Sequence, residues 1–106
     1  MIVTTGNEIA GRSIAGYIGI VRGIVVRSPS IAQGFLGGLK QIVGGNIESY
    51  ADLCESAREE AYERMVRHAD EMGADAVIAM RYDATEFNQG VTEVLAYGTA
   101  VKLARV

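Results

Sequence analysis

The feature that most constrains the fold is a long amphipathic segment, which predicts one helix from about Ser49 to Met72. At 1.5 Å per residue this helix would be roughly 36 Å long. Gly73 follows it, and glycine is a common residue just past the end of a helix. Its apolar stripe, which another layer of structure must bury, consists of Tyr50, Leu53, Ala57, Ala61, Met65, Ala69 and Met72.

Strands are predicted on both sides of this helix. In the segment Ile14 to Val26 most even positions are bulky and apolar, interrupted by Arg22, whereas the odd positions are mostly small. The last predicted strand divides its residues in the same way, with Ala96, Gly98 and Ala100 as its small face. We expect the helix to cover the large face of the sheet and another subunit to approach the small face. The predicted strands are Met1 to Thr5, Ile14 to Val26, Ala76 to Phe87 and Val91 to Arg105, with a turn at Asn88-Gln89-Gly90.

Together these elements predict a two-layer α+β domain, in which a small antiparallel sheet packs on the long helix around a β-α-β-β core. The 106 residues correspond to a single domain spanning positions 1–106. A further helix is predicted to begin at Ser28-Pro29, because serine is a good N-cap and proline fits the first helical position. Gly44-Gly45 is expected to end it.

The composition favours self-association. Hydrophobic residues make up 49% of the chain, yet a domain this small buries only about two-thirds of the surface that its unfolded chain exposes. We therefore expect a homo-oligomer with apolar surface between its subunits. The net charge of −3 and the absence of a basic stripe argue against a nucleic-acid partner.

The chain shows no sign of export or of a membrane segment. Its first residues lack a basic region typical of a signal peptide. The uncharged run from Ser28 to Leu39 is shorter than the roughly 20 residues that a membrane-spanning helix needs. The single cysteine, Cys54, fits a reducing compartment. A cytoplasmic protein without a membrane partner is therefore expected.

Charged residues within the predicted strands are the best candidates for a functional site. A charged side chain in a strand must be paired, solvated or engaged in a function such as ligand binding. Arg81 and Asp83 alternate along one strand and should share a face. Arg22 interrupts an apolar face, and Glu93 lies among large residues of the last strand. The four could form a ligand-binding site, or they could form ion pairs that fix strand register and assembly, and we favour the second interpretation.

Metal binding and catalysis find little support in the sequence. Cys54 and His68 lie on one predicted helix, about 21 Å apart along its axis, so they cannot share a metal ion within one chain. No metal ligand set, cofactor or catalytic residue is therefore assigned. Gly44, Gly45 and Asn46 precede the long helix and could expose backbone N–H groups to an anion. We favour the simpler interpretation, in which the glycines end a helix and allow tight packing.

The order of three segments carries a family resemblance: Gly44-Gly45, the run from Gly73 to Asp83, and Tyr97-Gly98-Thr99-Ala100-Val101. With other matching segments they resemble the YbjQ-like family, whose members are often labelled heavy-metal-binding proteins. The resemblance covers essentially the whole chain and implies a dodecin-like α+β subunit that assembles into pentamers or pairs of pentamers. This sequence departs from the family pattern at Asn46, where many relatives have arginine or glutamate, and at Ala79, where glycine is common. The segments that carry the resemblance are Ile42-Val43-Gly44-Gly45, Tyr50, Leu53, Ala57-Arg58-Glu59-Glu60-Ala61, Met65, the run from Gly73 to Asp83, and Tyr97-Gly98-Thr99-Ala100-Val101.

The leading hypothesis is a cytosolic, homo-oligomeric binding or scaffold protein, with five subunits favoured by the resemblance and any small-molecule ligand held between subunits. One alternative is a metal-binding protein whose ligands meet across subunit interfaces. Another is a small enzyme with an intersubunit active site, although we favour a role without catalysis.

Overall fold

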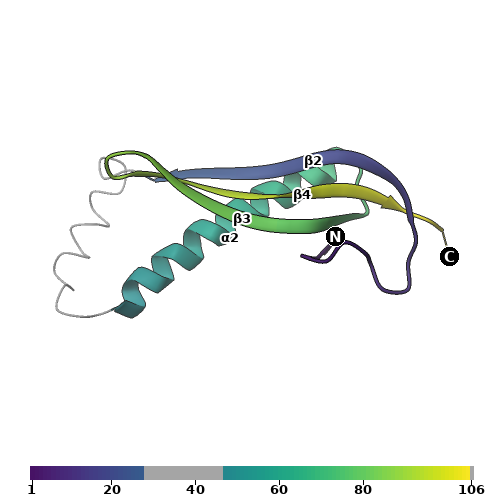
Figure 1. Ribbon diagram of the computed structural model, residues 1–106, viewed down its shortest axis with the longest axis horizontal. Helices are drawn as coiled ribbons and strands as arrows, with labels where there is room; N and C mark the ends of the chain where they lie inside the picture. Colours follow the sequence, from purple (N-terminus) through teal and green to yellow (C-terminus); the bar gives the residue numbers. More distant parts are fainter. Residues whose placement is uncertain (28–46, 106) are drawn as a thin grey trace.

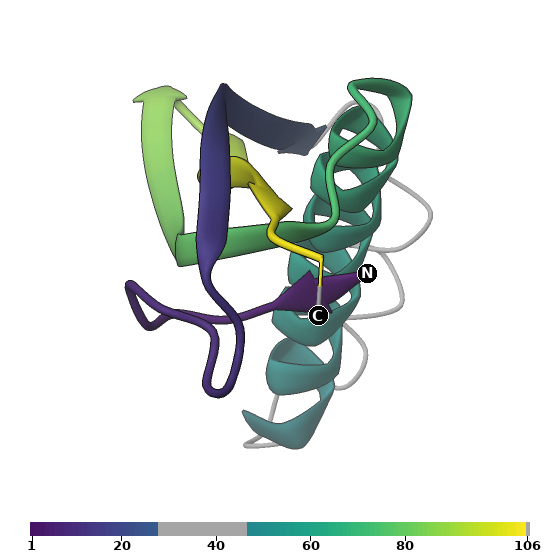
Figure 2. The ribbon, with the colours of Figure 1, turned by 90° about the vertical axis from the view of Figure 1, so that its right-hand side faces the viewer.

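The computed structural model describes residues 1–27 and 47–105, with side chains from residue 51 onward in the second range. A four-stranded sheet, in the order β1-β3-β4-β2, lies against a single long helix in this part of the chain (Figures 1 and 2). The predicted helix at Ser28-Pro29 and the Gly44-Gly45-Asn46 loop lie outside the described residues. The elements are β1 (Ile2–Val3), β2 (Ile14–Arg27), α2 (Ile47–Glu71), β3 (Ala76–Asn88) and β4 (Val91–Leu103).

The sheet is mixed, whereas the sequence predicted an antiparallel one. The three long strands β2, β3 and β4 pair antiparallel, as expected. The short strand β1 pairs parallel with β3, with Ile2 opposite Ala76 and Val3 opposite Val77. Backbone hydrogen bonds continue this contact beyond β1, because the Thr4 N–H donates to the Val77 carbonyl at 3.0 Å. The α+β class is therefore confirmed, with a correction to the type of sheet.

The helix ends where glycine was predicted to end it. Gly73 has a φ of 76°, a conformation that glycine adopts without steric cost. The Gly73 N–H donates to the Asp70 carbonyl at 3.0 Å, and the Ala74 N–H donates to the Ala69 carbonyl at 3.0 Å. These two bonds form a Schellman motif, which satisfies carbonyls that would otherwise lack partners at the helix end.

The helix packs on the small face of the sheet, so the predicted assignment of the two faces was wrong. Gly23 shows how close the layers are, because a Cβ there would lie 2.5 Å from the backbone nitrogen of Met65. The stripe of α2 is rich in alanine, and alanines against glycines and alanines let the layers approach closely. From Ile20 to Val26 the even-numbered side chains of β2 point away from the helix, whereas Ile18, beside a register shift, packs against the core that the helix covers. The buried core between the layers includes Val21, Val25, Ala57, Ala61, Met65, Ala69, Val77, Met80, Ala96 and Ala100.

A second, smaller core lies on the other face of the sheet, at the end where β2 begins. Ile9, in the segment between β1 and β2, packs there against residues of β3 and β4. The N-terminal segment therefore covers part of the face that α2 leaves open (Figure 1). The buried members of this cluster are Ile9, Ala76, Ile78, Val101 and Leu103.

Candidate functional site

The part of the sheet between this second core and the β3–β4 turn carries large side chains that no described segment of the chain covers. Ile20 is 70% exposed, Val26 is 42% exposed and Tyr97 is 37% exposed. Strand alternation places them opposite the buried residues Val21 and Val25, and therefore on the face away from α2. We call this surface the outer patch; it consists of Ile20, Arg22, Ile24, Val26, Arg81, Asp83, Glu93, Leu95 and Tyr97.

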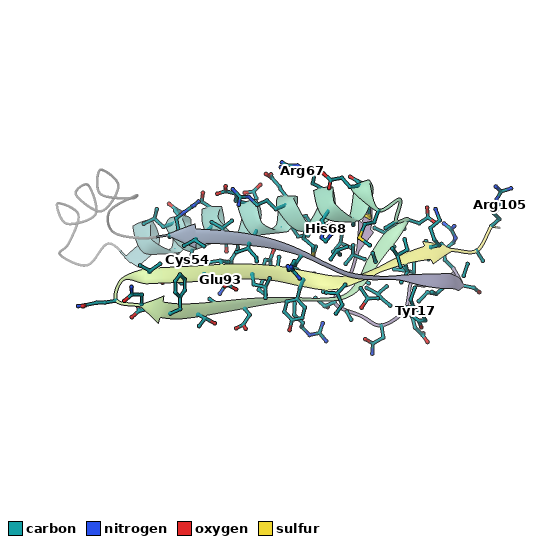
Figure 3. The ribbon with its side chains drawn as sticks, turned by 90° about the horizontal axis from the view of Figure 1, so that it is seen from above. Tyr17, Cys54, Arg67, His68, Glu93 and Arg105 are labelled. Carbon is teal, nitrogen blue, oxygen red and sulfur yellow. The ribbon has the colours of Figure 1, made fainter. Side chains whose placement is uncertain are left out.

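All four charged candidates from the sequence lie on the outer patch. Strand register places Tyr97 between Arg22 and Arg81 in one cross-strand row. Asp83 is opposite Leu95 in the next row. Glu93 of β4, labelled in Figure 3, lies one row further toward the β3–β4 turn. The patch therefore has a basic end near the N-terminal segment and an acidic end near the turn.

Arg81 makes a contact that the sequence did not predict. Its Nη1 donates to the carbonyl of Thr5 and to that of Met80, each at 2.8 Å. The hydrogen bond to Thr5 thereby holds the N-terminal segment against β3. None of the ion pairs found among the described residues includes one of the four candidates.

Replacing Arg81 with alanine is expected to lower the free energy of unfolding by about 1 kcal/mol, because two carbonyls lose a charged donor at an exposed position. Urea denaturation at one fixed protein concentration measures this loss. Glu63→Ala is the control, since Glu63 is exposed on α2 and takes part in none of the described ion pairs. Equal effects of the two substitutions would contradict the fastening role of Arg81.

The polar face of α2 binds the free edge of β2. Glu60, Arg64 and His68 follow one another at intervals of one turn and line this edge. Arg64 Nη1 donates to the Ile24 carbonyl at 2.7 Å, and His68 Nδ1 accepts the Arg22 N–H at 3.2 Å. These bonds occupy backbone groups that an edge strand would otherwise offer to another chain.

Glu60 and Arg64, one turn apart on α2, form an ion pair with 2.9 Å between their charged atoms. Arg27, at the end of β2, lies 2.6 Å from the other oxygen of Glu60. The hydrogen bond from Arg27 is the main cause that lowers the pKa of Glu60. Because all three side chains are more than one-third exposed, we expect a modest contribution to stability.

The residues that could ligate a metal ion are dispersed. Cys54 is exposed on the first half of α2, and His68 lies well along the same helix (Figure 3). In the part of the chain that the structure describes, no three His, Cys, Asp or Glu side chains lie close enough to hold an ion. The segment 28–46 contains none of these four residue types. Within a single chain, the side chains that the structure describes therefore bring no such donor set together.

A hollow that the sequence did not predict opens where β1, the N-terminal segment and the end of β4 meet. Its volume is about 540 Å³, and it is lined by Ile2, Arg12, Asp75, Lys102, Leu103 and Arg105. These residues come from separate parts of the chain, and no motif links them. The only sequence signal is the presence of two cations, Lys102 and Arg105, near the C-terminal end of the last strand.

Comparison with known proteins gives this fold a family. A family model described as "Putative heavy-metal-binding", YbjQ_1, matches residues 1–104. The chain belongs to this family, which confirms the resemblance found in the sequence. A UPF0145 protein of Legionella pneumophila (strain Philadelphia 1) is 59% identical over 101 residues, which cover 95% of this chain and 96% of that protein. A UPF0145 protein of Chromobacterium violaceum is 57% identical over 102 residues, covering 96% and 87% of the two chains.

A solved structure supports the fold. A protein of unknown function from Pediococcus pentosaceus, assigned to the DUF74 family, superposes with a TM-score of 0.63 and covers 98% of both chains. Its sequence is 20% identical, so the likeness concerns the fold alone. None of the helices described for this chain is long and apolar enough to cross a membrane.

Proposed function

We propose that this protein is a homo-oligomeric binding or scaffold protein whose subunits meet through the outer patch. The observation that carries the proposal is the exposure of large apolar side chains on a sheet face, with Ile20 at 70%. Contiguous apolar surface of this kind is characteristic of interaction sites. Covering it removes apolar area from water, at roughly 25 cal/mol per Å².

The charges of the outer patch favour a second copy of this chain as the partner. The basic row contains Arg22 and Arg81, and the acidic rows contain Asp83 and Glu93. A surface with one basic and one acidic end is complementary to itself when two copies meet in opposite directions. The basic end of each subunit then lies over the acidic end of its neighbour, which fixes the orientation of the contact.

A pair of pentamers and a cytoplasmic location are the expectations that accompany this proposal, because a two-fold contact joins subunits in pairs and would link two five-membered rings. The count of five follows from the family resemblance, and the location follows from the reduced thiol expected at Cys54. Any small-molecule ligand of the interface would lie among the patch charges of neighbouring subunits. The net charge of −3 disfavours nucleic acid as a partner.

The patch is tested by the substitution Ile20→Arg, which puts a charge in place of the most exposed apolar side chain of the outer patch. Light scattering after size exclusion, at micromolar concentration, should give the wild type a mass that is a multiple of 11.3 kDa. Ile20→Arg should give a smaller assembly or a monomer. Met72→Arg is the control, because Met72 is 40% exposed at the end of α2 and a cation is tolerated there. A monomeric wild type would refute the proposal.

A charge exchange tests the orientation of the contact. Arg22→Glu should weaken the assembly, because it places an acidic side chain against an acidic end. Combining Arg22→Glu with Glu93→Arg should restore part of the lost mass. A double variant no better assembled than the single one would exclude the antiparallel arrangement. Native mass spectrometry of the tag-free wild type reports the subunit count and any bound small molecule in one measurement.

A further inference from the structure

The geometry points to a second site, independent of the outer patch: the hollow beside the end of β4 binds a small organic anion through its carboxylate or phosphate group. The hollow is formed by three segments that meet at one end of the molecule, and Figure 2 views the molecule from this end. Its volume of about 540 Å³ falls within the range of roughly 300–1,000 Å³ that is usual for small-molecule sites.

Cationic side chains dominate this lining. Arg12, Lys102 and Arg105 line the hollow together with a single carboxylate, that of Asp75. The protein as a whole carries a net charge of −3. The excess of positive charge is therefore local, and it attracts anions to this end of an otherwise acidic protein.

The one carboxylate in the hollow is already engaged by the protein. Asp75 Oδ2 accepts the Leu103 N–H at 2.9 Å, and Lys102 Nζ lies 3.5 Å from Oδ1. The Leu103 N–H is the main cause that lowers the pKa of Asp75, followed by the charge of Lys102. Asp75 is therefore ionised and holds Lys102 beside the hollow. The positive charge of Lys102 in turn compensates the negative charge of Asp75.

The arginines keep donors for a ligand. Arg12 uses Nη2 to donate to the Ala104 carbonyl at 3.2 Å, which orients its guanidinium at the hollow and leaves its other N–H groups available. Arg105 has no hydrogen-bond partner among the described residues. Two guanidinium groups from different segments can bind one carboxylate or phosphate group together, with the forked geometry that such groups favour.

The lining also has an apolar side, which favours an organic anion over a bare inorganic ion. Ile2 of β1 is 44% exposed and lines the hollow with Leu103. A ligand with a short carbon skeleton would cover this surface while its acidic group meets the arginines.

Isothermal titration calorimetry with citrate and with glycerol 3-phosphate, in a low-salt Tris chloride buffer, tests the site. Wild-type protein should give a saturable isotherm with at least one of the two, and the tighter of the two identifies the preferred acidic group. Arg12→Gln and Arg105→Gln should each raise Kd roughly ten-fold or more, because each removes a charged donor. Arg67→Gln is the control, since Arg67 is exposed on α2 and does not line the hollow.

Two outcomes would overturn this site. One is the absence of saturable binding of either probe up to about 10 mM. The other is an equal loss in Arg67→Gln, which would show that general charge attraction explains the binding. Circular dichroism of every variant verifies the fold, and Arg105→Gln breaks no described hydrogen bond. The variant Ile20→Arg should bind as the wild type does, so the test separates this site from the proposed assembly surface.

Discussion

Replacing Gly23 with alanine is expected to lower the free energy of unfolding by about 3 kcal/mol or more, the upper part of the range for overpacked cores. The added Cβ would meet the carbonyl oxygen of Ala61 and would lie 2.5 Å from the backbone nitrogen of Met65. Both neighbours belong to the backbone of α2, so no side-chain rotation can make room. The helix must move away from the sheet, and the contacts of the whole interlayer core weaken together.

Gly16→Ala is the matched control on the same strand. A Cβ at Gly16 would meet no atom within 4 Å. We expect a change within about 1 kcal/mol, and a small gain is reasonable because alanine restricts the unfolded chain. Urea unfolding of both variants at the same protein concentration makes the comparison, since assembly would make stability depend on concentration. A Gly23→Ala variant as stable as Gly16→Ala would mean that α2 does not approach β2 as closely as described.

Local patterns in the sequence predicted most of the secondary structure. Helical spacing and Gly73 were sufficient to place α2, because a helix end depends on a few neighbouring residues. Alternation placed β2, β3 and β4 for the same reason. The parallel pairing of β1 with β3 was missed, because it joins segments more than seventy residues apart and the two residues of β1 carry no register signal.

The choice of sheet face illustrates a limit of periodicity. Alternation shows that β2 has a large and a small face, but it does not show which face the helix covers. The alanines of α2 contained the information, since a stripe of small residues permits close packing against Gly23 and Ala96. Because α2 covers the small face of the sheet, we now expect the contact between subunits on the outer patch.

Backbone geometry makes one departure from the family pattern unfavourable. Ala79 has a φ of 53°, in the left-handed region that glycine adopts more readily than alanine. It lies where the register between β3 and β4 shifts, and its N–H donates to the Gly6 carbonyl at 2.8 Å. The family resemblance implies glycine at this position, and glycine adopts that conformation without steric cost.

The two candidate sites differ in how far the sequence alone indicated them. Arg81 and Asp83 stood out because charge within a strand is unusual, and alternation correctly placed them on one face. The hollow depends on Arg12, Asp75 and Lys102, which only tertiary structure brings together. Each is an ordinary surface residue when considered alone.

Met65→Ala is expected to cost about 2–5 kcal/mol of unfolding free energy, the range for truncating a large core side chain. Met65 is 0% exposed and is among the largest fully buried side chains of the described structure. Its neighbours Ala61 and Ala69 are small and already packed, so they cannot move far into the space left behind. The cost therefore includes a cavity in addition to the lost burial of the side chain.

Met72→Ala supplies the comparison, because the same atoms are removed from a side chain that is 40% exposed. We expect a loss below about 1 kcal/mol for this variant, since little buried area disappears. Light scattering should show both variants at the wild-type mass wherever they remain folded, because Met65 faces the interior of the subunit and Met72 lies outside the outer patch. Dissociation of a folded Met65→Ala subunit would instead place the side chain at a contact between copies and contradict the assignment of faces. A cost as small as that of Met72→Ala would show that α2 does not bury its alanine-rich stripe against the sheet.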